Sequence, residues 1–333
     1  MRVSRRRILI GGLLALGTAG LIWGVVYFAS PREPTYQGKT LSTWIVPFCR
    51  QTTKGLDAPG GPEHFEELQP VRLAVRELGS NAVPFLIARL NARESGLHRT
   101  ARQLSEKLPY ASLRLTDPNV SKIRAVRALA ILGPDAGPAI PSLKPEVNDP
   151  TLSEHAVYAL SGMGAKGMRA LIEQYTNGFS IRIAATIVFP ASIYRGEANE
   201  IQTNQIPADI LIEGLSLIAK DAKNRTPPFQ TPAIQRLGMC GPLASNAVPI
   251  LLQVLDEHNS MTLQSTIFAL GKIGCQTEVV VPALSNLLSD PDPRIQMSAA
   301  SALRAFGYDA PFQSQVPRVI HPRPPVQTKE RYF

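Results

Sequence analysis

One pattern recurs along most of this chain: an apolar helix that ends in glycine, a short turn, and a second apolar helix. The terminal glycines of the copies are Gly79, Gly133, Gly164, Gly241, Gly274 and Gly307. Apolar or small residues occupy the positions one, four and eight before each glycine, which lie on one face of a helix. A single pair of helices cannot bury such a face, so successive pairs must stack on one another. The repeat therefore predicts an all-α fold, an α-solenoid of antiparallel helix pairs.

Glycine and proline mark the ends of the predicted helices. Glycine adopts the left-handed conformation that commonly ends a helix, and proline is tolerated in a helix's first turn. The prolines predicted to begin the second helices are Pro84, Pro141, Pro249 and Pro282. The word "SNAVP" occurs at 80–84 and again at 245–249, where Asn81 and Asn246 are candidate N-caps. We interpret this repeated word as scaffold at a turn rather than as a binding signature.

Two segments carry a family resemblance, "IRAVRALAILGPDAGPAIPSL" and "DPDPRIQMSAASALRAFG". Their Asp-Pro turn, arginine, helically spaced alanines and Leu and Gly positions resemble HEAT repeats, including the bacterial type related to phycobilisome-lyase HEAT-like repeats. The resemblance covers residues 64–310 and implies a HEAT-like superhelix of about six to seven repeats. Uneven glycine intervals predict an insertion near 91–116, interpreted as one extra helix, and a degenerate repeat near 176–230.

The N-terminus predicts a membrane anchor. Residues 8–29, which begin at Ile8 and end at Ala29, carry no charge and can cross a roughly 30 Å hydrocarbon layer as one helix. The preceding flank, residues 1–7, holds Arg2, Arg5, Arg6 and Arg7. By the positive-inside rule we expect a cytoplasmic flank and a single transmembrane helix in the cell membrane, with the solenoid exported to the periplasm or cell exterior.

Two other export signals stay open for the same segment. A cleavable signal peptide is disfavoured by Tyr27, three residues before a cut after Ala29, and by Pro31 just beyond it. A twin-arginine signal is suggested by the run "SRRRIL", although a plain basic flank explains the same residues. All three interpretations place the body of the protein on the exported side.

Both ends of the predicted solenoid have extra segments. Residues 30–63 are predicted to form a linker and a capping segment, in which Tyr36, Leu41 and Trp44 cover the first repeat. The stretch "YQGKTLSTWI" resembles a short segment that often precedes HEAT arrays in membrane-tethered bacterial proteins. The Pro-rich basic tail, residues 311–333, is either a docking peptide or a disordered terminus.

Motifs for chemistry are scarce. "GMGAKG" at 162–167 satisfies a dinucleotide-binding pattern, but the segment before it is helical by periodicity, whereas that motif needs a strand there. The five histidines have no metal-ligand spacing, and no nucleophile elbow, P-loop or zincin motif occurs. Cys49, Cys240 and Cys275 form no C-x-x-C pair, and Cys240 falls on a core position of the repeat. We therefore expect neither enzymatic activity nor a cofactor or metal.

The function expected from these features is a membrane-anchored scaffold that binds a protein partner. In HEAT arrays the second helices line the concave surface, and the resemblance makes four polar residues on those helices candidate partner contacts: Arg89, Glu173, Gln253 and Asn286. A lyase-like or chaperone-like protein acting on a chromophore-bearing partner is one alternative. Nucleic-acid binding is another, although the net charge of +9 falls to +5 without the four N-terminal arginines. A small-molecule substrate is not expected.

Overall fold

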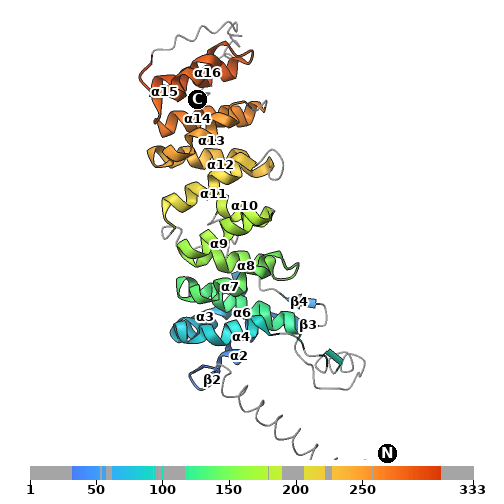
Figure 1. The fold of residues 1–333 in the computed structure, drawn as a ribbon. Coiled ribbons are helices and arrows are strands. Elements are labelled where there is room, and N and C mark those ends of the chain that lie inside the picture. The colour runs from blue at the N-terminus through green and yellow to red at the C-terminus, as the bar shows by residue number, and fades with distance from the viewer. Residues whose placement is uncertain are drawn as a thin grey trace, which may run out of the picture. The chain divides into compact units, whose positions relative to one another are not determined.

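The computed structural model describes residues 32–52, 55–57, 62–92, 94, 96, 99–100, 117–178, 180–189, 206–221, 227–256 and 259–308 (Figure 1). They belong to two compact units, one ending at Phe229 and one starting at Gln230. No helix within these ranges is long and apolar enough to cross a membrane. The membrane helix predicted at 8–29, the tail at 311–333 and most of the insertion near 91–116 lie outside them.

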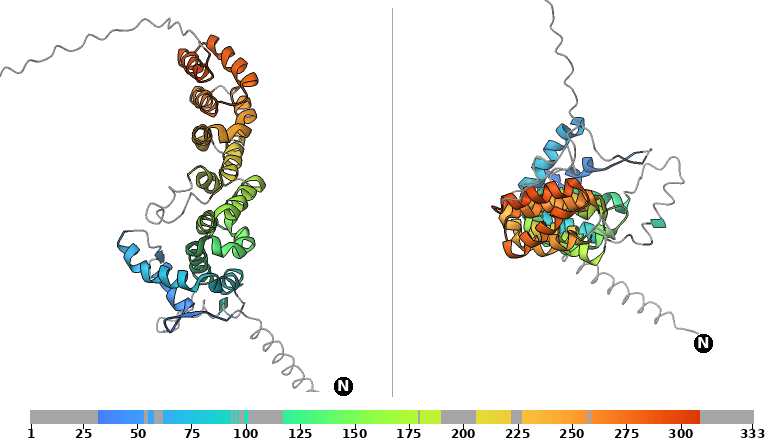
Figure 2. Two further views of the ribbon diagram at one scale, coloured as in Figure 1. Left: turned by 90° about the vertical axis from the view of Figure 1, so that its left-hand side faces the viewer. Right: turned by 90° about the horizontal axis from the view of Figure 1, so that it is seen from above.

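The helices follow one another as first and second members of pairs. The first helices are α3 (Pro62–Leu78), α6 (Pro118–Leu132), α8 (Ser153–Gly162), α10 (Ile181–Val188), α12 (Pro227–Met239), α14 (Ser260–Ile273) and α16 (Pro293–Ala305). The second helices are α4 (Val83–Asn91), α7 (Ile140–Leu143), α9 (Gly164–Asn177), α11 (Ala208–Asp221), α13 (Val248–Val254) and α15 (Thr277–Asn286). In the second unit α14 contacts α16 and α13 contacts α15, which gives two layers of helices (Figure 2).

The described residues thus confirm a helical solenoid, with one departure from an all-α fold. Two short antiparallel hairpins precede the first helix pair: β1 (Thr35–Tyr36) with β2 (Lys39–Thr40), and β3 (Arg50–Thr52) with β4 (Gly55–Asp57). The region predicted as a degenerate repeat contains α10 and α11, which pack against each other.

The apolar faces predicted from the repeat form the core of both units. The residues four positions before the terminal glycines are all at most 2% exposed: Val75, Leu129, Leu160, Leu237, Leu270 and Leu303. The six glycines have positive φ, between 53° and 83°, as predicted for them; Gly274 takes the left-handed helical conformation, whereas Gly133, with a ψ of −127°, does not. Cys240 is only half-buried, so its prediction as a core residue is wrong; it is the first residue after α12, which ends at Met239. Its thiol is free, and partial burial raises the pKa of that thiol.

The prolines begin three of the four second helices as predicted. Pro84, Pro141 and Pro249 lie in the first turns of α4, α7 and α13. Pro282 lies inside α15 instead, because this helix already begins at Thr277. The second helix expected around "SLKPEV" is interrupted: α7 ends at Leu143, and the 3-10 helix η4 (Pro145–Asn148) follows, since Pro145 has no amide hydrogen.

The two "SNAVP" words form 3-10 turns that lead directly into the next α-helix. These turns are η2 (Gly79–Ala82) and the end of η6 (Gly241–Ala247). The N-cap residues are Ala82 and Ala247, and neither makes a side-chain cap bond, so the prediction that Asn81 and Asn246 cap these helices is wrong. A preceding 3-10 turn supplies carbonyls to the first amides of the helix, which then need no side-chain cap.

The residues before the first pair, 32–49, pack against the first helices α3 and α6, and we call them the capping segment. It contains β1, β2, α2 (Leu41–Trp44) and the 3-10 helix η1 (Val46–Phe48). Leu41 and Phe48 are buried. Trp44 and Tyr36 are half-buried, and Trp44 Nε1 donates a hydrogen bond to the carbonyl oxygen of Tyr36 at 3.0 Å.

Two arginines of α6 hold the end of the capping segment. Arg124 donates from Nε and Nη2 to the carbonyl oxygen of Cys49, at 2.9 and 2.6 Å. Arg127 Nη1 donates to the carbonyl oxygen of Phe48 at 2.6 Å. Burial lowers the pKa of Arg124, although an arginine side chain remains protonated at neutral pH. The guanidinium groups therefore satisfy two carbonyls that the short η1 leaves without helical partners.

The "GMGAKG" stretch joins two helices, α8 and α9, so a helix precedes it as predicted. Gly164 has a φ of 64°, which suits the turn between them. A Cβ atom at Gly167 would lie 1.9 Å from the carbonyl oxygen of Leu160, on α8. These glycines thus serve the turn and the close packing of α8 on α9.

Candidate partner-binding surface

The four residues predicted as partner contacts lie on second helices, two in each unit. Arg89 is on α4, Glu173 on α9, Gln253 on α13 and Asn286 on α15. Glu173, Gln253 and Asn286 are exposed, whereas Arg89 is half-buried.

Arg89 and Glu173 bind neighbours within the first unit. Arg89 Nη2 donates to Ser42 Oγ at 2.9 Å, and Nη1 donates to Ser121 Oγ at 3.4 Å, so this side chain links the capping segment to α6. Glu173 Oε2 pairs with Lys144 Nζ at 2.5 Å. Both side chains make contacts within the fold, which leaves Gln253 and Asn286 as the better exposed candidates.

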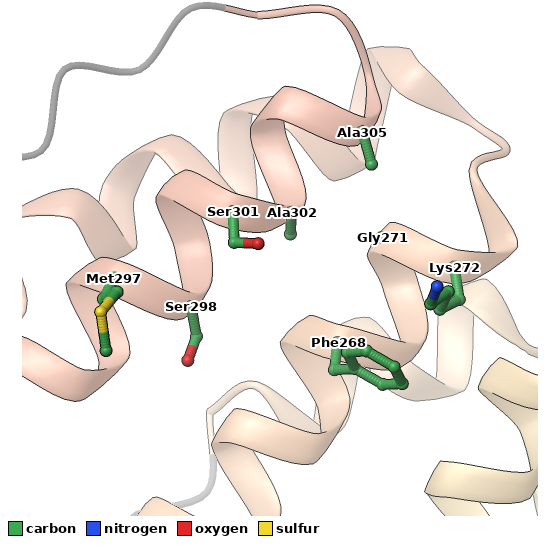
Figure 3. Close-up of a pocket in the computed structure, with 8 residues that line it drawn as sticks. All are labelled: Phe268, Gly271, Lys272, Met297, Ser298, Ser301, Ala302 and Ala305. Atoms are coloured by element: carbon green, nitrogen blue, oxygen red, sulfur yellow. The ribbon is translucent and has the colours of Figure 1, made fainter.

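An exposed apolar trough lies on the other layer of the second unit, between the first helices α14 and α16 (Figure 3). We call it the α14–α16 trough; it has a volume of about 420 Å³. Phe268 of α14 and Met297 of α16 line it and are 53% and 55% exposed. Large apolar side chains that remain half in water are typical of binding surfaces when they gather around a depression.

The trough forms because small residues let the two helices approach closely. A Cβ atom at Gly271 would lie 3.1 Å from Cβ and 3.2 Å from Cα of Ala302. Ser298, Ser301 and Ala305 continue this line of short side chains along α16 (Figure 3). The bulky Phe268 and Met297 therefore stand above a shallow floor.

Positive charge accompanies this apolar surface. Lys272 lines the trough, and its Nζ lies 5.4 Å from the centroid of the Phe268 ring, within cation–π range. The helices α12, α14 and α16 carry Arg236, Lys272, Arg294 and Arg304 and no aspartate or glutamate. Arg294 is paired with Asp292, the N-cap residue of α16. A complementary partner would therefore combine apolar and acidic groups.

This surface lies on first helices, whereas the residues predicted from the sequence to contact a partner all lie on second helices. A signal was present: Phe268 lies six residues before Gly274, and Met297 ten residues before Gly307, off the face that the repeat buries. Large apolar residues at outward positions of a repeat are not needed for the core.

The described residues offer no evident site for metal chemistry. No group of three or more His, Cys, Asp and Glu side chains among them could hold a metal ion. His155, on α8, is half-buried: partial burial and the nearby Arg127 lower its pKa to about 4, so it is neutral at pH 7. A neutral imidazole costs less to bury than a charged one.

Comparisons with known proteins give one family match and a number of remote structural likenesses, of which three are described. The family described as HEAT repeats matches residues 228–317. No curated protein matches. Two crystal structures of engineered proteins are 15% and 14% identical, with TM-scores of 0.33 and 0.24; they cover 80% of this chain in each case and 78% and 96% of their own.

The third structure is the complex of CpcE and CpcF of phycocyanin lyase from Nostoc sp. PCC7120. It is 20% identical with a TM-score of 0.27, over 82% of this chain and 97% of that one. The segment whose sequence matches HEAT repeats includes α12 to α16, and it contains the α14–α16 trough.

Proposed function

We propose that this protein is a non-enzymatic scaffold, anchored in the membrane by residues 8–29, which binds a protein partner through its solenoid on the exported side. The observation that carries the binding role is the exposed, positively charged apolar trough between α14 and α16. HEAT repeats stack into extended surfaces that suit protein partners, and the trough lies in the matched segment. The anchor and its orientation rest on the uncharged segment and the four arginines before it.

Photo-crosslinking in living cells tests the binding role. Benzoylphenylalanine in place of Phe268, Gln253 or Asn286 in the full chain is expected to yield a discrete crosslinked product with one protein at one or more of these sites. The matched control is Asn177, which is exposed at the end of α9 in the first unit and is expected to yield none. If none of the three test sites gave a specific crosslinked product, the proposed scaffold function would be contradicted.

Protease accessibility tests the anchored topology. With an epitope after Phe333, protease added to intact spheroplasts is expected to destroy the epitope while a cytoplasmic marker stays whole, because the positive flank retains the N-terminus inside. The protein is also expected to remain in the membrane fraction after a high-salt wash. Protection of the epitope until the spheroplasts are lysed would show that the body is not exported.

A further inference from the structure

The capping segment shows how this chain covers the groove between two first helices. Its η1 contacts both α3 and α6. The carbonyl oxygens of Phe48 and Cys49 accept hydrogen bonds from Arg127 and Arg124 of α6. Cys49 also packs with apolar residues of this surface, including Val120 of α6. A short apolar turn, anchored through its carbonyls, therefore lies against these two first helices.

The α16 side of the α14–α16 trough lies at repeat positions that the capping segment covers on α6. Counted back from the glycine that ends each helix, Arg127 and Arg124 occupy the sixth and ninth positions of α6. In α16 those positions hold Ser301 and Ser298, which line the trough. Ser298 Oγ already donates to the carbonyl oxygen of Arg294 at 2.8 Å, so Ser301 offers a hydroxyl donor where α6 offers a guanidinium group.

Burial at equivalent positions differs as expected if one surface is covered and the other is not. Ile123, ten residues before its glycine, is 4% exposed, whereas Met297 at the same position of α16 is 55% exposed. Val120, thirteen residues before, is fully buried, whereas Met261 at the same position of α14 is 69% exposed. α16 at the tenth position and α14 at the thirteenth thus each keep one apolar residue exposed where the chain itself covers α6, whereas Leu73 of α3, at the position of Phe268, is 53% exposed as Phe268 is.

We propose that the α14–α16 trough binds a short segment of a partner protein in which an apolar turn is followed by a carboxylate. The apolar side chain would pack between Phe268 and Met297, and the carboxylate would pair with Lys272. Charge complementarity selects an acidic segment, because Lys272 is the one charged residue among those that line the trough and Arg294 of α16 is already paired with Asp292. The chain's own capping segment is already held on α6, so it is not the occupant. This proposal names the partner chemistry for the scaffold function and rests on that function.

A defined peptide tests the proposal with the full chain in detergent. The probe is fluorescein-labelled Ile-Val-Pro-Phe-Ser-Glu, patterned on η1 and its flanking residues, and binding is measured by fluorescence polarisation. Saturable binding is expected, and it is expected to weaken about tenfold for a peptide with serine in place of phenylalanine. The Phe268→Ser variant is expected to weaken it by a similar factor. Val279→Ser, at an apolar residue 49% exposed on second helix α15, is the matched control and is expected to leave binding unchanged.

A charge reversal at Lys272 distinguishes a specific ion pair from non-specific hydrophobic binding. Lys272→Glu is expected to lower the affinity for the peptide that ends in glutamate about fivefold and to raise the affinity for a peptide that ends in lysine. If Lys272→Glu bound each of the two peptides as tightly as the unsubstituted chain does, the proposal would be overturned. So would tight binding of a DNA duplex, lost in Lys272→Glu, without peptide binding. If Gln253 or Asn286 gave crosslinks in cells but the peptide did not bind, the trough would not be the binding site, while the scaffold function would stand.

Discussion

Replacement of Gly167 by alanine is expected to lower the free energy of unfolding of the first unit by about 3 kcal/mol or more. The added Cβ would lie 1.9 Å from the carbonyl oxygen of Leu160, so α8 and α9 would have to separate. In an open helix the same change would stabilise the protein by about 1 kcal/mol, because alanine is the better helix former. The predicted change in the free energy of unfolding therefore has the opposite sign to the change that helix propensity alone would give. Urea denaturation of the full chain in detergent, followed by circular dichroism, measures it.

Gly137→Ala is the matched control for this experiment. Gly137 is in the same unit, in the 3-10 helix η3 (Gly133–Ala139), and a Cβ atom there would meet nothing within 4 Å. Its denaturation midpoint is expected to change little. If Gly167→Ala proved as stable as the control, the close packing of α8 on α9 would be wrong.

Arg124→Met is expected to release the end of the capping segment from α6. The two hydrogen bonds from its guanidinium to the carbonyl oxygen of Cys49 would be lost, and hydrogen bonds from a charged group contribute about 2 kcal/mol. Cys49 is 2% exposed, so its thiol reacts only when this segment opens. If the free energy needed to open the segment fell by about 2 kcal/mol, a thiol reagent would label Cys49 about thirtyfold faster.

The labelling is done in a chain with Cys240→Ser and Cys275→Ser, so that Cys49 is the one reactive thiol. Arg304→Met serves as the control, because Arg304 is an exposed arginine in the last turn of α16. The control is expected to label at the rate of the parent. An unchanged rate in Arg124→Met would mean that Arg127 and apolar packing suffice to hold the segment.

Local sequence rules predicted the repeat well. The chain turns at the end of each first helix through a residue with positive φ, which glycine adopts without a steric clash. This requirement depends on the backbone of one residue, so the sequence shows it directly. The apolar stripe is a property of helical spacing and was confirmed by the buried residues four before each glycine. Prolines in the first turn follow the same local logic at Pro84, Pro141 and Pro249.

The predictions that were wrong depended on what precedes or surrounds a residue. The N-caps at Asn81 and Asn246 were wrong because a 3-10 turn already supplies carbonyls to the next helix. Pro282 was misplaced because α15 begins at Thr277. The role of Arg89 as a partner contact stays a prediction; the tertiary structure adds its hydrogen bonds to two serines far away in sequence.

By itself, the sequence determined the repeat of helix pairs, the glycine that follows each first helix and the main apolar face that each helix buries, since these follow from residue spacing along one chain. Only the tertiary structure decided which outward residues are covered and which remain open. Val120 and Met261 occupy the same repeat position, yet one is buried and the other is 69% exposed. The difference arises from what packs against each helix: a segment that precedes the repeats lies on α6, where Arg124 and Arg127 hold its carbonyls. A contact between segments so far apart in sequence has no signature in the local pattern.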